Sequence, residues 1–158
     1  MEKITLFWFR RDLRIEDNCG FYHALQGENK VIPIFIFDED ILKKLPKKDA
    51  RVEMILLALS TIDVAMKRNR CTVGKYHGTP EAIFLKLIKQ WNVDKVICNA
   101  DYEPYATERD EKIKKLLIKA GIQFETYKDQ VIFEKDEVVK GDGTPYKVYT
   151  PFSRKWLE

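Results

Sequence analysis

The stretch "FWFRRDLRIEDN", residues 7–18, joins the end of an apolar run to a dense cluster of charge. The apolar run, Lys3–Phe9, is short and rich in aromatic and β-branched residues, which predicts a buried strand. Arg10, Arg11 and Arg14 follow this run at once. Charge at that position suits a phosphate-binding site, a cofactor pocket or a network of ion pairs. The rest of the sequence is needed to distinguish these three.

Four more apolar runs predict strands at residues 30–37, 71–76, 93–98 and 122–127. Between the runs, apolar residues recur at helical spacing and predict helices over residues 18–27, 49–68, 79–91 and 107–121. Continuous apolar strands that alternate with helices indicate a parallel sheet covered on both faces. With right-handed crossovers, the sequence predicts a three-layer, doubly wound, Rossmann-like α/β fold of five mainly parallel strands.

Polar residues that can cap a helix stand at the expected helix starts. Asp17 or Asn18 precedes the first helix, Asp49 the second and Thr79 the third, where proline follows at the first helical position. We expect the segment "DYEPYATERDE" to be a loop whose Thr107 caps the fourth helix.

The last part of the chain has a different pattern. "GDGTPY", residues 141–146, predicts a turn whose flanking runs pair as a hairpin, and no apolar helix is expected after it. Trp156 stands near the end with nothing after it to bury it. We therefore expect a domain over residues 1–130 and a tail over residues 131–158 that leads towards a missing segment.

Composition excludes several classes of protein. The chain has 158 residues, 28 of them basic and 25 acidic, so it is one domain in size and too balanced in charge for a dedicated nucleic-acid binder. The three cysteines, Cys19, Cys71 and Cys98, fit neither a disulfide framework nor a metal site. No apolar run reaches transmembrane length and no signal peptide is visible, so we expect a cytoplasmic protein. We expect neither a membrane nor a metal ion among its partners.

Ligands of a doubly wound sheet bind outside the carboxyl ends of its strands, near the point where the strand order reverses. The segments at that edge are residues 10–14, 38–40, 76–78 and 99–103, which should converge on one crevice. No glycine-rich phosphate loop follows a strand, and no nucleophile stands with either histidine, so we expect no catalytic residue. Because arginine pairs well with carboxylates, an ion-pair network is favoured over phosphate binding, with these acids as candidate partners: Asp12, Asp17, Asp38, Asp101 and Glu103.

Four motifs occur here in the same order as in the photolyase/cryptochrome family: "WFRRDLRIEDN", "PIFIFDEDIL", "NADYEPYATERDE" and "GDGTPYKVYTPFSRKW". They span essentially the whole chain, which resembles the N-terminal α/β antenna domain of that family and is most similar to that of a deoxyribodipyrimidine (cyclobutane pyrimidine dimer) photolyase.

The resemblance implies a function that needs a second domain. FAD, the lesion pocket and most of the DNA-binding surface belong to a following helical domain, which this chain is too short to contain. In the full-length protein, a pyrimidine dimer is flipped out of damaged DNA and split by an electron from light-excited, reduced FAD. The N-terminal domain holds a second chromophore that harvests light for FAD, so we expect this segment alone to be inactive.

The family uses methenyltetrahydrofolate, a deazaflavin or a flavin such as FMN as antenna. Folate-type members resemble "YEVNER" where this chain has "YEPYAT", and their Asn-Glu pair, which contacts the pterin, is Tyr105-Ala106 here. The resemblance therefore favours a deazaflavin or FMN, or no bound chromophore, over the folate. It implies an inner-crevice site lined by Arg10, Arg11, Phe37, Asp38, Arg51, Asp101 and Glu103.

Three alternatives stay open at this point. The chain is a cryptochrome-type photoreceptor domain, a stand-alone nucleotide-binding domain for stress response or electron transfer, or a scaffold that packs on the helical domain. An exposed apolar patch around Phe152 and Trp156 would mark the last of these.

Overall fold

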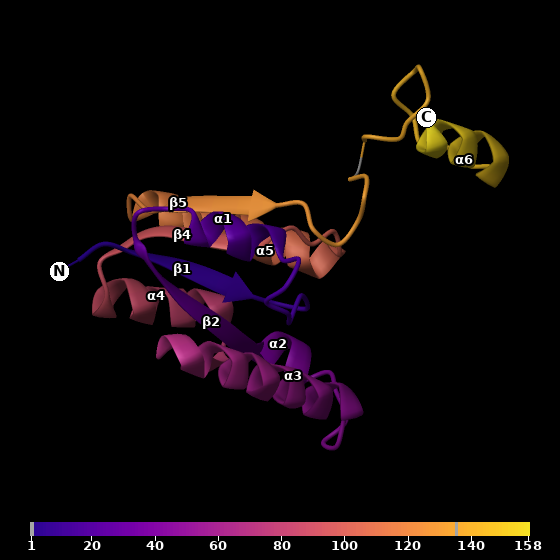
Figure 1. Ribbon diagram of the computed structural model, residues 1–158. Helices are drawn as coiled ribbons and strands as arrows, with labels where there is room; N and C mark the ends of the chain where they lie inside the picture. Colours follow the sequence, from indigo (N-terminus) through magenta and orange to yellow (C-terminus); the bar gives the residue numbers. More distant parts are fainter. Residues whose placement is uncertain (1, 135) are drawn as a thin grey trace.

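The computed structural model describes residues 2–134 and 136–158 and contains one sheet of five parallel strands (Figure 1). The strands lie side by side in the order β3-β2-β1-β4-β5. They are β1 (Ile4–Phe9), β2 (Lys30–Asp38), β3 (Gly74–Gly78), β4 (Val93–Asn99) and β5 (Gln123–Tyr127). The predicted parallel α/β fold is thus confirmed. β3 begins later than predicted, because its pairing with β2 starts only where Gly74 meets Ile34.

Helices cover both faces of the sheet. On one face, α1 (Cys19–Leu25) and α3 (Ala50–Met66) pack on side chains such as Phe7 and Phe9 of β1. On the other face, α4 (Pro80–Gln90) and α5 (Pro104–Lys119) pack on alternate residues such as Leu6 and Trp8. Each side therefore has its own apolar core, as expected for strands whose neighbouring side chains point in opposite directions.

Three of the four predicted helix caps are confirmed. The side chains of Asn18, Asp49 and Thr79 accept hydrogen bonds from the first turns of α1, α3 and α4. The prediction that Thr107 caps the fourth helix is wrong, since α5 begins at Pro104 and the Thr107 N–H already donates to the Glu103 carbonyl. Proline suits that first position, because its fixed φ is helical and no N–H is needed there.

Two short helical elements were not expected from the sequence. α2 (Glu39–Leu42) follows β2 directly, and the Asp38 carboxylate caps it by accepting from the Asp40 N–H. A 3₁₀ turn (Lys67–Asn69) extends the end of α3. Among the described residues, no helix has both the length and the apolar character needed to cross a membrane.

The tail departs from the predicted hairpin. The turn forms, with the Gly143 N–H donating to the Lys140 carbonyl at 2.9 Å, but the described residues on either side of it form no strands. Pro145 stands directly after the turn and cannot donate to a strand ladder. Instead α6 (Tyr149–Leu157) follows, a helix of mixed polar and apolar residues that the sequence analysis did not predict, and Figure 1 shows it apart from the sheet.

The tail places several apolar side chains wholly or partly in solvent. Trp156 of α6 meets Phe133 edge to face, with 5.6 Å between ring centroids, and Phe152 meets Tyr146 at 6.3 Å. Tyr149 and Leu157 are largely exposed. The division of the chain at residue 130 stays a prediction, three residues beyond the end of β5 at Tyr127.

Candidate functional site

The strand order reverses between β1 and β4. From β1 the chain passes to β2 and β3 on one side of the sheet, and it then returns to form β4 and β5 on the other side. The segments that leave β1 and β4 at their carboxyl ends therefore flank the position where doubly wound folds bind ligands.

Arg10, the first residue after β1, is buried against α5. Its Nη1 lies 2.8 and 2.6 Å from the two carboxylate oxygens of Asp110, and its guanidinium carbon lies 5.3 Å from the centre of the Trp8 ring. The backbone N–H of Arg10 donates to Asp12 at 2.8 Å. Within the described residues, the buried Nη2 of Arg10 has no hydrogen-bond partner. Arg10 is thus held rigidly and retains one unused donor.

A second buried arginine completes this cluster. Arg109 of α5 donates to Asp110 at 3.0 Å, and its guanidinium carbon lies 4.8 Å from the Trp8 ring centre and 5.9 Å from that of Tyr105. Sequence reasoning selected neither Arg109 nor Asp110 as a site residue. Arg109 falls on the inward stripe of α5 with Ala106 and Ile113, and an arginine on such a stripe was the signal available.

Arg11 forms the outer, half-exposed part of the charged cluster. Its Nε lies 3.4 Å from Asp101, and its Nη2 lies 2.8 Å from Glu103, both at the carboxyl end of β4. The hydrogen bond with Glu103 raises the pKa of Arg11 above its ordinary value. These contacts bring together three of the predicted site residues at the junction of β4 and α5.

Asp38, at the end of β2, reaches the same helix. Its Oδ2 accepts a 2.6 Å hydrogen bond from the hydroxyl of Tyr105, while its Oδ1 caps α2. Burial and the hydrogen bond to this carboxylate both raise the pKa of Tyr105, so the hydroxyl stays protonated and donates. Phe37 is half-buried next to Asp38 in the chain, but its ring packs on the other face of the sheet, edge to face on Phe35 at 4.9 Å.

Arg51, the seventh predicted residue, pairs with a neighbour in its own segment. It is exposed at the start of α3, where its Nε and Nη2 donate to Asp49 at 2.9 and 2.7 Å. In the described part of the chain, Asp49 is the ion-pair partner of Arg51. None of the other six predicted site residues forms an ion pair with Arg51 there.

A buried polar network fixes the loop between β1 and α1. Asn99 donates to Asp12 at 2.6 Å and to Asn18 at 2.9 Å, and it accepts from the Gly20 N–H at 2.7 Å. Arg14 donates to the Asp17 carbonyl at 2.5 Å and to Asp129 at 2.9 Å. The loop that follows β1 is therefore held by the last residue of β4 and by a residue that follows β5.

The ion-pair interpretation of "RRDLR" is confirmed, since each of its arginines pairs with a carboxylate. The partners of Arg11 were among the predicted acids. The partners of Arg10 and Arg14, Asp110 and Asp129, were not among them.

Two hollows open near this edge of the sheet. One of 180 Å³ lies between the ends of β4 and β5 and is lined by polar groups that include Asp101, Asp110 and Glu134. The other, of 570 Å³, lies beside α1 and is lined by Arg14, Asp129 and apolar residues of α1. Side chains in the described regions include no group of three or more His, Cys, Asp or Glu placed to hold a metal ion.

Comparisons with known proteins agree with this architecture. The sequence model of the DNA photolyase family matches residues 5–158. The deoxyribodipyrimidine photo-lyase of Synechococcus sp. is 32% identical over 151 residues, which cover 96% of this chain and 31% of that protein. Cryptochrome-1 of Macaca fascicularis is 27% identical over 94% of this chain and 25% of its own length.

Solved structures of photolyases are similar to this chain as well. A bacterial class III photolyase from Agrobacterium tumefaciens superposes with a TM-score of 0.86 at 27% identity, covering 98% of this chain and 31% of that one. An archaeal photolyase from Sulfolobus tokodaii, described with two FAD molecules and the implication of a novel light-harvesting cofactor, has a TM-score of 0.74 at 33% identity, over 84% and 32% of the two chains. This chain therefore spans about a third of the length of these relatives.

Fold and site together define a doubly wound parallel α/β domain with a charged, aromatic wall at its switch point. The match over residues 5–158 identifies the family more closely. The chain belongs to the DNA photolyase family and corresponds to the N-terminal α/β region of its members.

Proposed function

We propose that this chain is the light-harvesting domain of a DNA photolyase and holds an antenna chromophore at the carboxyl edge of its sheet. The observation that carries the proposal is the wall around the switch point, where arginine donors, carboxylate acceptors and the rings of Trp8 and Tyr105 lie together. A planar, polar ring system needs such a wall to fix its orientation. The chromophore would absorb light and pass the excitation energy to FAD.

The residues present fit a flavin or a deazaflavin. Arg10 has a buried Nη2 donor without an acceptor in the described structure, and a ring carbonyl or phosphate oxygen would supply one. Arg11 and Glu103 are exposed enough to close over a bound ring, and Phe37 offers an apolar edge. We therefore propose the following six residues as the site: Arg10, Arg11, Phe37, Asp38, Asp101 and Glu103.

Methenyltetrahydrofolate is the less suitable antenna. The Tyr105 hydroxyl already donates its hydrogen bond to Asp38, and Ala106 is buried and has no polar side chain. Neither residue therefore offers the contacts of the folate-type Asn-Glu pair. The Sulfolobus tokodaii relative, described with two FAD molecules, supports the flavin class.

DNA repair would require a second domain in addition to this chain. We propose that the chain acts with an FAD-binding helical domain of the photolyase type, which splits pyrimidine dimers in damaged DNA by light-driven electron transfer from reduced FAD. The similarity to cryptochrome-1 supports a second candidate, a blue-light photoreceptor domain. Dimer repair under blue light by the chain joined to its helical domain separates the two, because a photoreceptor would signal without repair.

Titration of the chain with FMN, FAD, a deazaflavin and methenyltetrahydrofolate, each alone, tests the proposal by absorbance and fluorescence. We expect the visible band of a flavin or the deazaflavin to shift, and that of the folate to stay unchanged. Arg11→Ala should weaken binding about tenfold through loss of a charged donor. Arg51→Ala, an equally drastic change outside the proposed site, should leave binding unchanged. Unshifted spectra with all four compounds would refute the antenna role.

A further inference from the structure

The larger of the two hollows, beside α1, has in its wall a buried carboxylate oxygen that accepts no hydrogen bond from the described residues. This oxygen belongs to Asp129, which follows β5 and whose side chain is 2% exposed. Its Oδ1 accepts from Arg14 at 2.9 Å and from the Cys19 N–H at 3.0 Å, whereas its Oδ2 is without a partner there. Because buried polar atoms of folded proteins are nearly always paired, Oδ2 indicates a place for the N–H donor of a ligand.

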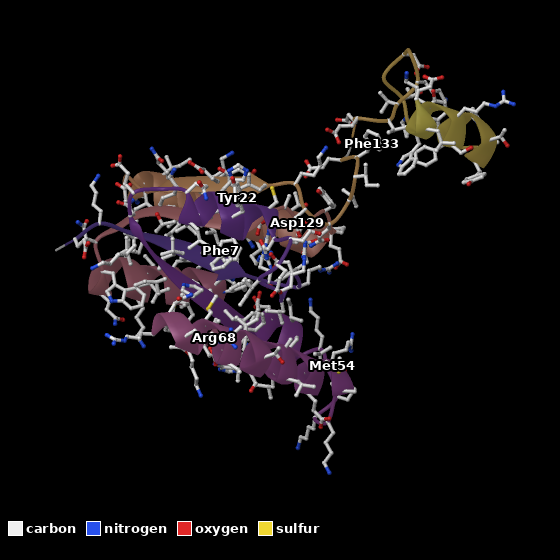
Figure 2. The ribbon with its side chains drawn as sticks, viewed as in Figure 1. Phe7, Tyr22, Met54, Arg68, Asp129 and Phe133 are labelled. Carbon is white, nitrogen blue, oxygen red and sulfur yellow. The ribbon has the colours of Figure 1, made fainter. Side chains whose placement is uncertain are left out.

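The remaining walls of the hollow are mostly apolar. Ile15, Phe21 and Leu25 line it, and so does Tyr22, which is 60% exposed. Figure 2 labels Tyr22 and Asp129 on the same side of the sheet. The volume of 570 Å³ is that of a small-molecule site, and apolar walls with a few polar groups are typical of such sites.

The charges around the hollow already balance. Arg14 pairs with Asp129, and Lys128, which also lines the hollow, pairs with Glu137. A cationic ligand would therefore place a second positive charge beside Arg14, and an anionic ligand would meet the Asp129 carboxylate. The ligand that fits is neutral, with an N–H donor for Asp129 and a flat apolar body for the ring of Tyr22.

We propose that this hollow binds a neutral nucleoside whose base carries an exocyclic amino group, with adenosine as the representative. The amino group would donate to Oδ2 of Asp129, and the base would pack on Tyr22 and Leu25. This inference is independent of the proposed antenna role.

A side chain from another part of a longer protein is a less suitable occupant. Lysine or arginine would bring the second cation that Arg14 disfavours, and the amide of asparagine or glutamine would fill little of the 570 Å³. Tryptophan combines a neutral N–H donor with a large ring, so it is the competitor that the test must include.

Isothermal titration calorimetry of the chain with adenosine and with purine riboside tests the proposal, because these two compounds differ only in the amino group. We expect adenosine to bind at least about tenfold more tightly, since purine riboside offers no donor to the Asp129 oxygen. Tyr22→Ala should weaken adenosine binding through lost packing on the base. Tyr149→Ala is the matched control, because Tyr149 is 79% exposed in the tail, and it should leave binding unchanged. Circular dichroism would verify that both variants are folded.

A reversal of specificity separates a ligand contact from a purely structural role of Asp129. Asp129→Asn presents an amide N–H donor in place of an acceptor, so it should favour inosine, whose 6-oxo group accepts a hydrogen bond, over adenosine. Equal binding of adenosine and purine riboside to the wild type would overturn the proposal. So would a preference for adenosine that Asp129→Asn leaves intact, or a failure of all three nucleosides to bind. Tighter binding of N-acetyltryptophanamide than of adenosine would overturn it as well and would assign the hollow to a protein segment.

Discussion

The hydroxyl of Tyr105 donates a 2.6 Å hydrogen bond to Oδ2 of Asp38, which joins the first turn of α5 to the end of β2 across the carboxyl edge of the sheet. β1 lies between β2 and β4, the strand that precedes α5, in the sheet order. The contact therefore links the two segments that flank the end of the central strand at this edge.

Loss of this brace should destabilise the domain. In Tyr105→Phe, the buried Asp38 carboxylate loses its donor, and we expect the free energy of unfolding to fall by about 1–2 kcal/mol. Urea denaturation measures the change. Tyr22→Phe provides the control, because Tyr22 is exposed and its hydroxyl makes no hydrogen bond among the described residues. Equal stability of Tyr105→Phe and the wild type would show that Asp38 is satisfied by solvent.

The packing of α1 against β4 should not tolerate a larger residue at Gly20. A Cβ at that position would lie 2.5 Å from Oδ1 of Asn99, which accepts from the Gly20 N–H and also anchors Asp12 and Asn18 through its amide. We expect Gly20→Ala to lower the free energy of unfolding by about 1–3 kcal/mol through overpacking.

Gly27→Ala is the comparison for this variant. The nearest atom to a Cβ at Gly27 is the Ala24 carbonyl oxygen, at 3.6 Å, so the same substitution meets no obstacle there. Urea denaturation of both variants should separate them clearly. If Gly20→Ala unfolds at the same urea concentration as Gly27→Ala, the buried network must be loose enough to move.

Local patterns were sufficient to predict most of the fold. β1 and β2 are continuous apolar runs, and Asn18, Asp49 and Thr79 cap their helices as expected, since both features depend on neighbouring residues alone. The start of α5 was misplaced because Pro104 and Thr107 are both good starting residues, and only the contact of Tyr105 with Asp38 favours the earlier one.

The site was predictable only as a region. Strand ends that meet at one edge brought Arg11 to Asp101 and Glu103, as expected. The choice of Asp110 for Arg10 was not predictable, because several acids compete at this edge and distance in space decides among them. Arg51 was included for its position after the second loop, but Asp49 is close enough in the chain to pair with it first.

The buried cluster around Asp110 should be far more sensitive than an ion pair on the surface of the same helix. Asp110→Asn removes the charge that Arg10 and Arg109 share beside Trp8, and leaves two buried guanidinium groups without a carboxylate. We expect a loss of about 3–5 kcal/mol in the free energy of unfolding. Glu108→Gln breaks the exposed pair with Lys112 and should change stability by less than about 1 kcal/mol. Similar losses in calorimetry for the two variants would contradict this view of the cluster.

The cap of α3 should titrate in acid. Arg51 hydrogen-bonds the Asp49 carboxylate and lowers its pKa from 3.8 to about 2. Because the pKa is lower in the folded state, the carboxylate stabilises the fold above pH 3.8, and this contribution disappears as the pH falls through about 2. Asn also caps helices but does not titrate. The stability difference between the wild type and Asp49→Asn, followed by urea denaturation, should therefore be constant near neutral pH and should move in favour of the variant on acidification. A difference that stays the same over this range would mean that the ion pair with Arg51 does not persist in solution.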